Sequence, residues 1–308
     1  MSYTTKIKTE ILNLSIEKST IIAELAAFIK NNGEIKKDKF SLSTENVDIA
    51  NNISEKIMRI YNVSPKIEEK TNANFTKKTL YTIIVDKKKN EILQDLGIVD
   101  KNNKIIEQTP KYLINSKEET KAYIRGVFLT AGSINDPKTS RYHMEVLIDN
   151  PKEAVFYQQL LNEYELNSKI LTRDKGYMVY LKEAEKISDY IKILGASTQV
   201  LYFENIRIYR EQKNNTNRLN NCEQANTDKI IQTATIQLEH IRTIEENLSV
   251  NLLDDKTKEA LTYRKKYPDS SLKELAEIIS LETNNKISKP GLNHRFRKIK
   301  ELAEKICQ

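Results

Sequence analysis

The sequence predicts an α+β fold in which one α+β unit is duplicated and followed by a small all-α domain. Two observations predict the duplication. An apolar helix that stops at a glycine occurs twice, over residues 15–32 and 116–132, and each copy precedes strands, a helix, a hairpin and a closing helix in the same order. Three short helical patterns over 256–308 predict the all-α domain.

The first unit begins with the helix over 15–32. Its apolar and small residues recur at steps of three and four, and Gly33 ends it. The stripe consists of Ile16, Thr20, Ala23, Ala27 and Phe28. An extended segment (34–45), a helix (47–63), a strand pair (64–70 and 77–86) and a short helix ending at Gly97 follow.

The second unit begins at Ser116, which forms a capping-box pattern with Glu119, and its first helix ends at Gly132. A strand follows over 142–149, and the next helix has Pro151 in its first turn. The hairpin is expected over 168–174 and 176–182, and the closing helix over 183–195.

Residues 206–250 connect the two domains. The stretch 210–229 is polar and rich in asparagine, which indicates either a linker or the exposed start of a helix. A long amphipathic helix is expected over 228–248, acting as a spacer or a packing strut, with one apolar stripe of Ile230, Ala234, Ile241, Ile244 and Leu248. The predicted domains are therefore 1–205, with pseudo-repeats at about 15–100 and 116–200, then the connection 206–250, then 251–308.

The all-α domain is expected to contain helices over 256–267, 271–280 and 289–306. Pro268 separates the first two, Ser270 or Ser271 can cap the second, and Ser288 can cap the third. Three short helices with a basic last one are typical of a helix-turn-helix module. The turn before the last helix is longer than the 3–4 residues usual in that module.

The last helix has two different faces. At about 100° per residue, the buried face consists of Leu292, Phe296, Ile299, Ala303 and Ile306. His294, Arg297 and Lys298 point the opposite way, with Asn293 on the flank. Arg295 lies near the edge, where it can lay its stem on the core or reach a backbone phosphate.

Asparagine and arginine at the start of such a helix read adenine and guanine edges, and lysine serves phosphates. We therefore predict a DNA-binding set of Ser288, Lys289, Asn293, His294, Arg295, Arg297 and Lys298. The alternative is a solvated basic face on an ordinary three-helix bundle.

The composition favours an anionic partner. The formal net charge is +7, which fits double-stranded DNA first and an anionic membrane second. We expect no membrane association and a cytoplasmic, nucleoid-associated protein, because the chain shows no signal segment and no apolar run long enough to span a bilayer. Two cysteines and three scattered histidines predict neither a metal site nor a cofactor.

The two helices that end at a glycine resemble a known sequence motif. LAAFIKNNG (25–33) and IRGVFLTAG (124–132) are both similar to the LAGLIDADG motif of homing endonucleases. In that fold the two motif helices pack at a pseudo-two-fold axis, and small residues allow their close approach. The resemblance assigns that packing to Ala26, Ala27, Gly33, Gly126 and Gly132.

Three further segments, in this order, resemble the WhiA family of bacterial regulators: 125–146, 217–226 and 291–304. That family joins a LAGLIDADG-like domain to a C-terminal helix-turn-helix domain. The resemblance implies a DNA-binding regulator of transcription that acts in cell division and chromosome segregation, and in sporulation where the host sporulates.

An active LAGLIDADG nuclease has one carboxylate near the end of each motif helix, and the pair holds divalent metal. Asn32 and Ala131 stand at these positions, so we expect no catalytic residues, no metal and no enzyme. Glu34 and Asp136 lie just beyond the helices and could form a displaced site, although solvent-exposed loop carboxylates are the simpler interpretation. Residual endonuclease activity and a protein-interaction scaffold, with a protein partner at the duplicated domain, remain the alternatives.

Overall fold

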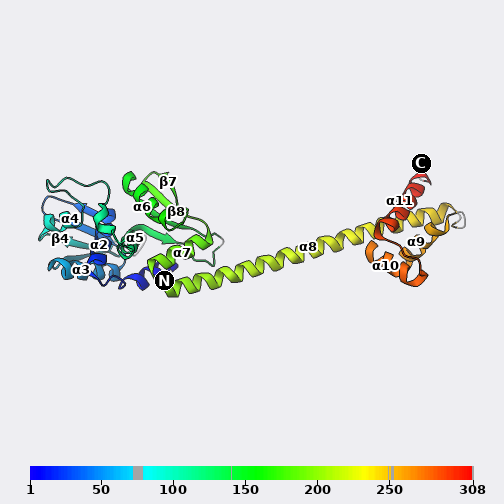
Figure 1. Ribbon diagram of the computed structural model, residues 1–308, viewed down its shortest axis with the longest axis horizontal. Coiled ribbons are helices and arrows are strands. Elements are labelled where there is room, and N and C mark those ends of the chain that lie inside the picture. Colours follow the sequence, from blue (N-terminus) through cyan, green and yellow to red (C-terminus); the bar gives the residue numbers. More distant parts are fainter. Residues whose placement is uncertain (72–78, 140, 249, 251–252, 307–308) are drawn as a thin grey trace. The chain divides into compact units, whose positions relative to one another are not determined.

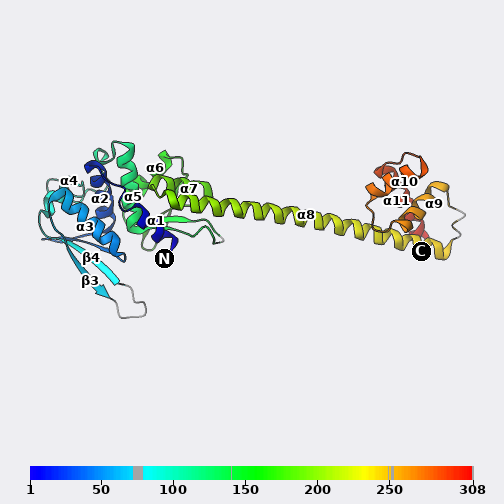
Figure 2. The same ribbon diagram turned by 90° about the horizontal axis from the view of Figure 1, so that it is seen from below.

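The computed structural model describes residues 1–71, 79–139, 141–248, 250 and 253–306 (Figures 1 and 2). The chain divides into two compact units, Met1–Arg210 and Glu211–Gln308. The first is α+β and the second is helical. No described helix is long and apolar enough to cross a membrane.

The first unit contains the predicted duplication. Its first half consists of α2 (Lys18–Asn32), β1 (Gly33–Ile35), β2 (Phe40–Thr44), α3 (Val47–Tyr61), β3 (Lys66–Thr71), β4 (Thr79–Val85) and α4 (Lys89–Asp95). Its second half consists of α5 (Lys117–Ala131), β5 (Gly132–Ile134), β6 (Met144–Ile148), α6 (Pro151–Glu163), β7 (Lys169–Arg173), β8 (Gly176–Leu181) and α7 (Ala184–Leu194). Each half forms a four-stranded antiparallel sheet, in the orders β1-β2-β4-β3 and β5-β6-β8-β7. Residues 77 and 78, which we predicted in the strand of β4, lie outside the described residues.

The helix starts follow the predicted caps. The Ser116 hydroxyl accepts a hydrogen bond from the N–H of Glu119, whose side chain in turn accepts one from the N–H of Ser116, so the capping box is complete. Asn150 caps α6, and Pro151 occupies its first turn, where the missing N–H costs no helical hydrogen bond.

Helices α2 and α5 pack against one another in the middle of the first unit (Figure 1). A methyl group at Gly126 would lie 2.4 Å from the carbonyl oxygen of Glu24 and 2.7 Å from the Cβ of Ala27. Gly126 therefore allows the two backbones to approach closely at Ala27, and both Ala26 and Ala27 are buried.

Gly33 and Gly132 are required for a different reason than Gly126. The nearest atoms to a methyl group at either position belong to its own helix, to Ile29 and Phe128 respectively. Both glycines have extended backbone angles and begin the strand that follows the helix. They let the chain leave the helix sharply, whereas we had expected them to act in the contact between helices.

Two buried carboxylates lie beside the helix pair. Glu24 is fully buried, pairs with Lys56 and lies 3.7 Å from the guanidinium of Arg125. Glu153 is 1% exposed and lies 3.5 Å from the ammonium of Lys30. Each acid thus has a cationic partner, as a buried charge requires.

Two features of the first unit differ from the prediction. A helix that we had not predicted, α1 (Tyr3–Ile11), buries Tyr3, Ile7 and Ile11. Helix α2 begins at Lys18, and Ile16 precedes it with 66% of its surface exposed, so Ile16 does not belong to the apolar stripe. Before α5, the chain also forms the short 3-10 helix η1 (Lys111–Ile114).

The polar stretch 210–229 is helical and not an irregular linker. It lies within α8 (Ser197–Asn247), a single helix of 51 residues. In the second unit, α8 is followed by α9 (Asp255–Lys266), α10 (Leu272–Thr283) and α11 (Lys289–Ile306). Ile241 and Ile244 of the predicted stripe belong to the core of this unit, Leu248 packs against it, Ala234 is buried and Ile230 is half-buried.

Candidate nucleic-acid interface

Helix α11 presents a polar, cationic face to solvent. Leu292 and Ile299 are fully buried on its other side, together with Phe296 and Ala303. Asn293, His294, Arg297 and Lys298 are all exposed, in agreement with the predicted faces. For Asn293, His294 and Arg297, the described part of the chain offers no hydrogen-bond or ion-pair partner, so these side chains are available to an external ligand.

The turn before α11 is ordered by side chains. It covers residues 284–288, which makes it longer than a usual helix-turn-helix turn. Asn284 has left-handed backbone angles, and the N–H of Ile287 donates to the Ser280 hydroxyl at 2.9 Å. The Ser288 hydroxyl accepts from the N–H of Gly291 at 3.2 Å and so caps the helix. Lys289 is exposed in the first turn of the helix.

Arg295 differs from the other cations of the helix. It forms an ion pair with Glu259 of α9 and donates to the carbonyl oxygen of Lys256 at 3.3 Å. Of the two roles expected for Arg295, this contact favours packing against the core of the unit over reaching a phosphate.

Beyond Lys298 the exposed surface of the helix becomes mixed in charge. Glu301 and Glu304 are exposed in the second half, and Lys300 lies 3.6 Å from Glu304. Acidic side chains repel phosphates, and recognition helices contact base edges with their N-terminal residues. The charge distribution therefore favours an approach of DNA to the N-terminal half of α11.

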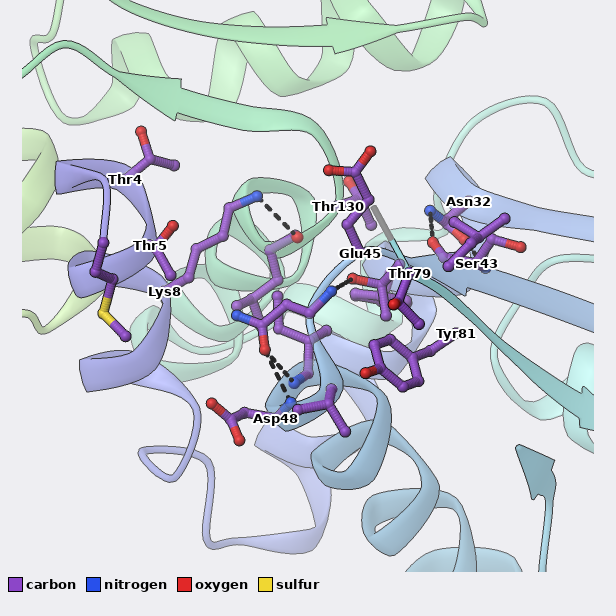
Figure 3. Close-up of a pocket in the computed structure, with 18 residues that line it drawn as sticks. Thr4, Thr5, Lys8, Asn32, Ser43, Glu45, Asp48, Thr79, Tyr81 and Thr130 are labelled. Carbon is purple, nitrogen blue, oxygen red and sulfur yellow. Dashed lines mark hydrogen bonds between the residues drawn. The ribbon is translucent and has the colours of Figure 1, made fainter. Parts of the chain in front are cut away.

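Figure 3 shows the region where the two motif helices of the first unit end. The Asn32 amide donates to the carbonyl oxygen of Ser43 at 2.9 Å, and its oxygen accepts from the N–H of Ser43 at 2.7 Å. Both polar groups of Asn32 thus hold strand β2. Ala131, at the matching position of α5, has only a methyl group.

Helix α1 brings Lys8 to the same region. An open pocket of about 780 Å³ is lined by Lys8, Asn32 and Thr130, among others (Figure 3). The Lys8 ammonium donates to the carbonyl oxygen of Leu129 at 3.1 Å, and burial lowers the pKa of Lys8 to about 8. Lys8 was missed from the sequence, although Tyr3, Ile7 and Ile11 form a visible helical stripe around it.

The carboxylates considered for a displaced site make local contacts. Glu34 is exposed and lies 3.0 Å from Lys36. Asp136 accepts from the N–H of Lys138 at 2.9 Å. His143, which directly precedes β6, lies 3.0 Å from Glu145 of that strand. Within the described residues, His, Cys, Asp and Glu side chains form no group of three or more that could hold a metal ion.

Comparison with known families matches three parts of the chain. Residues 18–99 match the model described as the WhiA N-terminal LAGLIDADG-like domain. Residues 120–213 match the WhiA LAGLIDADG-like domain, and residues 216–303 match the WhiA C-terminal HTH domain.

Similar proteins cover almost the whole chain. The "Probable cell division protein WhiA" of Bacillus cereus strain G9842 is 40% identical over 312 residues, which cover 99% of this chain and 97% of the relative. The protein of the same name from Bacillus mycoides strain KBAB4 is 39% identical over 310 residues, with 99% and 97% covered. The crystal structure of full-length DUF199/WhiA from Thermatoga maritima is 19% identical with a TM-score of 0.59, covers 99% of this chain and 98% of that chain, and supports the fold.

Proposed function

Because the chain belongs to the WhiA family, we propose that it is a non-enzymatic, DNA-binding regulator that acts in cell division. The observation that carries this proposal is the exposed face of Asn293, His294, Arg297 and Lys298 at the start of α11, in the segment that matches a WhiA HTH domain. Arginine and asparagine at this place suit base edges, and Lys298 suits a phosphate.

The proposal extends to the cellular role. The relatives carry the words "cell division protein" in their name, and the family resemblance adds control of transcription and chromosome segregation, with sporulation in hosts that sporulate. Such a role implies a cytoplasmic protein associated with the nucleoid. Ser288, Lys289, Asn293, His294, Arg297 and Lys298 form the proposed DNA-binding set, and Arg295 supports the helix through Glu259.

The absence of catalysis is also part of the proposal. Asn32 is engaged by the backbone of Ser43, and Ala131 offers no ligand atom, so the two motif positions lack the paired carboxylates that Mg²⁺ needs. A supercoiled plasmid incubated with the chain and Mg²⁺ or Mn²⁺ should remain intact. Nicking above the level of a mock preparation would favour the endonuclease alternative.

A salt titration of DNA binding by the full chain tests the main proposal. Affinity for duplex DNA should fall as salt rises, because bound phosphates release counterions. Arg297→Ala should weaken binding about tenfold or more, and Lys298→Ala should weaken it on all sequences and reduce the salt slope by about 1. Lys305→Ala, in the last turn beyond Glu301, is the control and should change little. Unchanged affinity in both test variants would remove the assignment of this face.

Protein docking at the first unit is a second candidate function, supported by an apolar row on the sheet of β5–β8. Leu147 and Leu171 both lie opposite Met178 in the strand register. They are 36% and 43% exposed. DNA-binding sheets present polar and basic side chains to phosphates, so this row suits a protein better. Near-equal DNA binding by segments 1–200 and 220–308, or none by either, would favour this candidate.

A further inference from the structure

The second unit has a basic pocket that the proposed base-reading face does not include. The pocket has a volume of about 430 Å³, and its cationic lining residues are Lys229 of α8, Arg264 of α9, Lys273 of α10 and Lys289 of α11. The remaining lining residues are Asn226, Ile230, Thr233, Ser270, Ser271 and Leu272. No acidic side chain is among the described residues that line it, and the one carboxylate paired with a lining cation, that of Glu277, lies 4.0 Å from Lys273 on the exposed surface of α10. Four cations from four helices therefore meet around one space.

Arg264 is the most unusual of these cations because it is 1% exposed. One of its guanidinium nitrogens, Nη1, donates to the carbonyl oxygens of Tyr267, Pro268 and Ser270, at 3.4, 3.4 and 2.6 Å. The guanidinium lies 5.5 Å from the ring centre of Phe296. Its Nε is buried and has no hydrogen-bond partner in the described part of the chain. No carboxylate pairs with it there either, whereas the buried acids of the first unit each have a cation.

A buried cation without a counter-ion is costly, and an unsatisfied buried donor indicates a missing ligand or ion. The start of α10 is a second feature that favours an anion in this pocket. The capping box of Ser271 and Glu274 engages the N–H groups of those two residues. The N–H groups of Leu272 and Lys273 begin the helix at the pocket, where the helix dipole favours an anion.

We propose that this pocket binds a phosphate group of the DNA backbone, held by Arg264, Lys229 and Lys273. The proposal rests on the proposed DNA-binding function. Lys289 connects the pocket to the face of α11, because it lines the pocket and stands one helical turn before Asn293. The proposal also gives a role to the segment 217–226, which resembles a WhiA motif, because its last residue, Asn226, lines the phosphate site.

The first test measures DNA affinity of the full chain against salt concentration. Lys229 and Lys273 are exposed, so Lys229→Gln and Lys273→Gln should fold normally. Each should weaken DNA binding on every sequence, and the double variant should reduce the salt slope by about 2, because each lost phosphate contact contributes about 1. The control is Lys265→Gln, which removes the same charge from a lysine that pairs with Glu245 and does not line the pocket. A double variant that binds DNA with the slope of the control would overturn the inference and leave the proposed function intact.

The second test uses inorganic phosphate as the probe, against chloride at equal ionic strength. The melting temperature of the second unit within the full chain should rise to a plateau with phosphate. Thr233→Glu, which places a carboxylate in the pocket at an exposed position, should abolish this saturable rise. Any general salting-out effect of phosphate acts equally on both proteins.

The two tests together separate the failures. A wild-type chain that binds no DNA would end the proposed function. In that case, a saturable phosphate effect that is present in the wild type and absent in Thr233→Glu would still support a phosphate-binding pocket. Its ligand would then be a free phosphorylated molecule and not DNA. The absence of any difference between the two proteins would overturn the inference as well.

Discussion

Replacing Gly126 by alanine puts a methyl group into the contact between α2 and α5. The new Cβ would lie 2.4 Å from the carbonyl oxygen of Glu24 and 2.7 Å from the Cβ of Ala27. Both neighbours are fixed to the helix backbone, so neither can rotate away and the helices must separate. Overpacking of this kind costs about 1–3 kcal/mol, and alanine recovers about 0.5–1 kcal/mol in a helix interior. Contacts of 2.4 and 2.7 Å place the cost near the upper end of this range, so we expect Gly126→Ala to lower the free energy of unfolding by about 2 kcal/mol.

Calorimetric unfolding of the full chain provides the assay. A loss of about 2 kcal/mol should lower the melting temperature of the first unit by about 4–8 °C, given its size. The matched control is Gly291→Ala in α11, where the nearest atom, the Ser288 oxygen, lies 3.4 Å from the new Cβ. This substitution should stabilise the second unit by about 0.5–1 kcal/mol, because alanine restricts the unfolded chain. If Gly126→Ala were neutral or stabilising like the control, the close approach of the two helices would be refuted.

Two further predictions concern the region where the motif helices end. The pKa of Lys8 is lowered from 10.5 to about 8, so between these values the unfolded chain binds more protons than the folded chain. The unfolding free energy of the wild type should therefore rise relative to that of Lys8→Met by up to about 3 kcal/mol as the pH increases from about 8 to 10.5. Denaturant titrations measure both free energies, and a difference between the two proteins that did not change with pH would contradict the prediction. Asn32→Ala should cost about 1–3 kcal/mol, because the N–H of Ser43 loses its acceptor. Asn32→Asp should also destabilise, by placing a carboxylate against the Ser43 carbonyl, and Mg²⁺ should not raise its melting temperature.

The elements that were predicted well depend on local physics. The capping box at Ser116, the proline in the first turn of α6 and the two faces of α11 are each determined by residues within a few turns of one another. Periodicity and side-chain capping groups are readable at that range. The exposure of Arg297 follows from the same periodicity.

The features that were missed depend on contacts between distant residues. Lys8 reaches the carbonyl oxygen of Leu129, 121 positions later in the chain. Arg264 lies in a run of basic residues that indicates a solvated surface, and only the fold buries it. The ion pair of Arg295 with Glu259 joins two helices. Periodicity places Arg295 near the edge of the buried face and leaves two roles open for it, and only the contact with Glu259 decides between them.

Lys8 is a further obstacle to metal binding, in addition to the missing carboxylates at Asn32 and Ala131. A LAGLIDADG centre needs a carboxylate at the end of each motif helix, and these two positions have instead the amide of Asn32 and the methyl of Ala131. The pocket at Asn32 is lined by Glu45 and Asp48, which lie outside the motif helices, and also by the ammonium of Lys8. The buried carboxylate of Glu24 is neutralised elsewhere by Lys56. An ammonium group in the same pocket as position 32 would compete with Mg²⁺ for the oxygens of restored acids. We therefore infer that Asn32→Asp with Ala131→Asp would still leave an inactive protein, and that binding metal would require the removal of Lys8 as well.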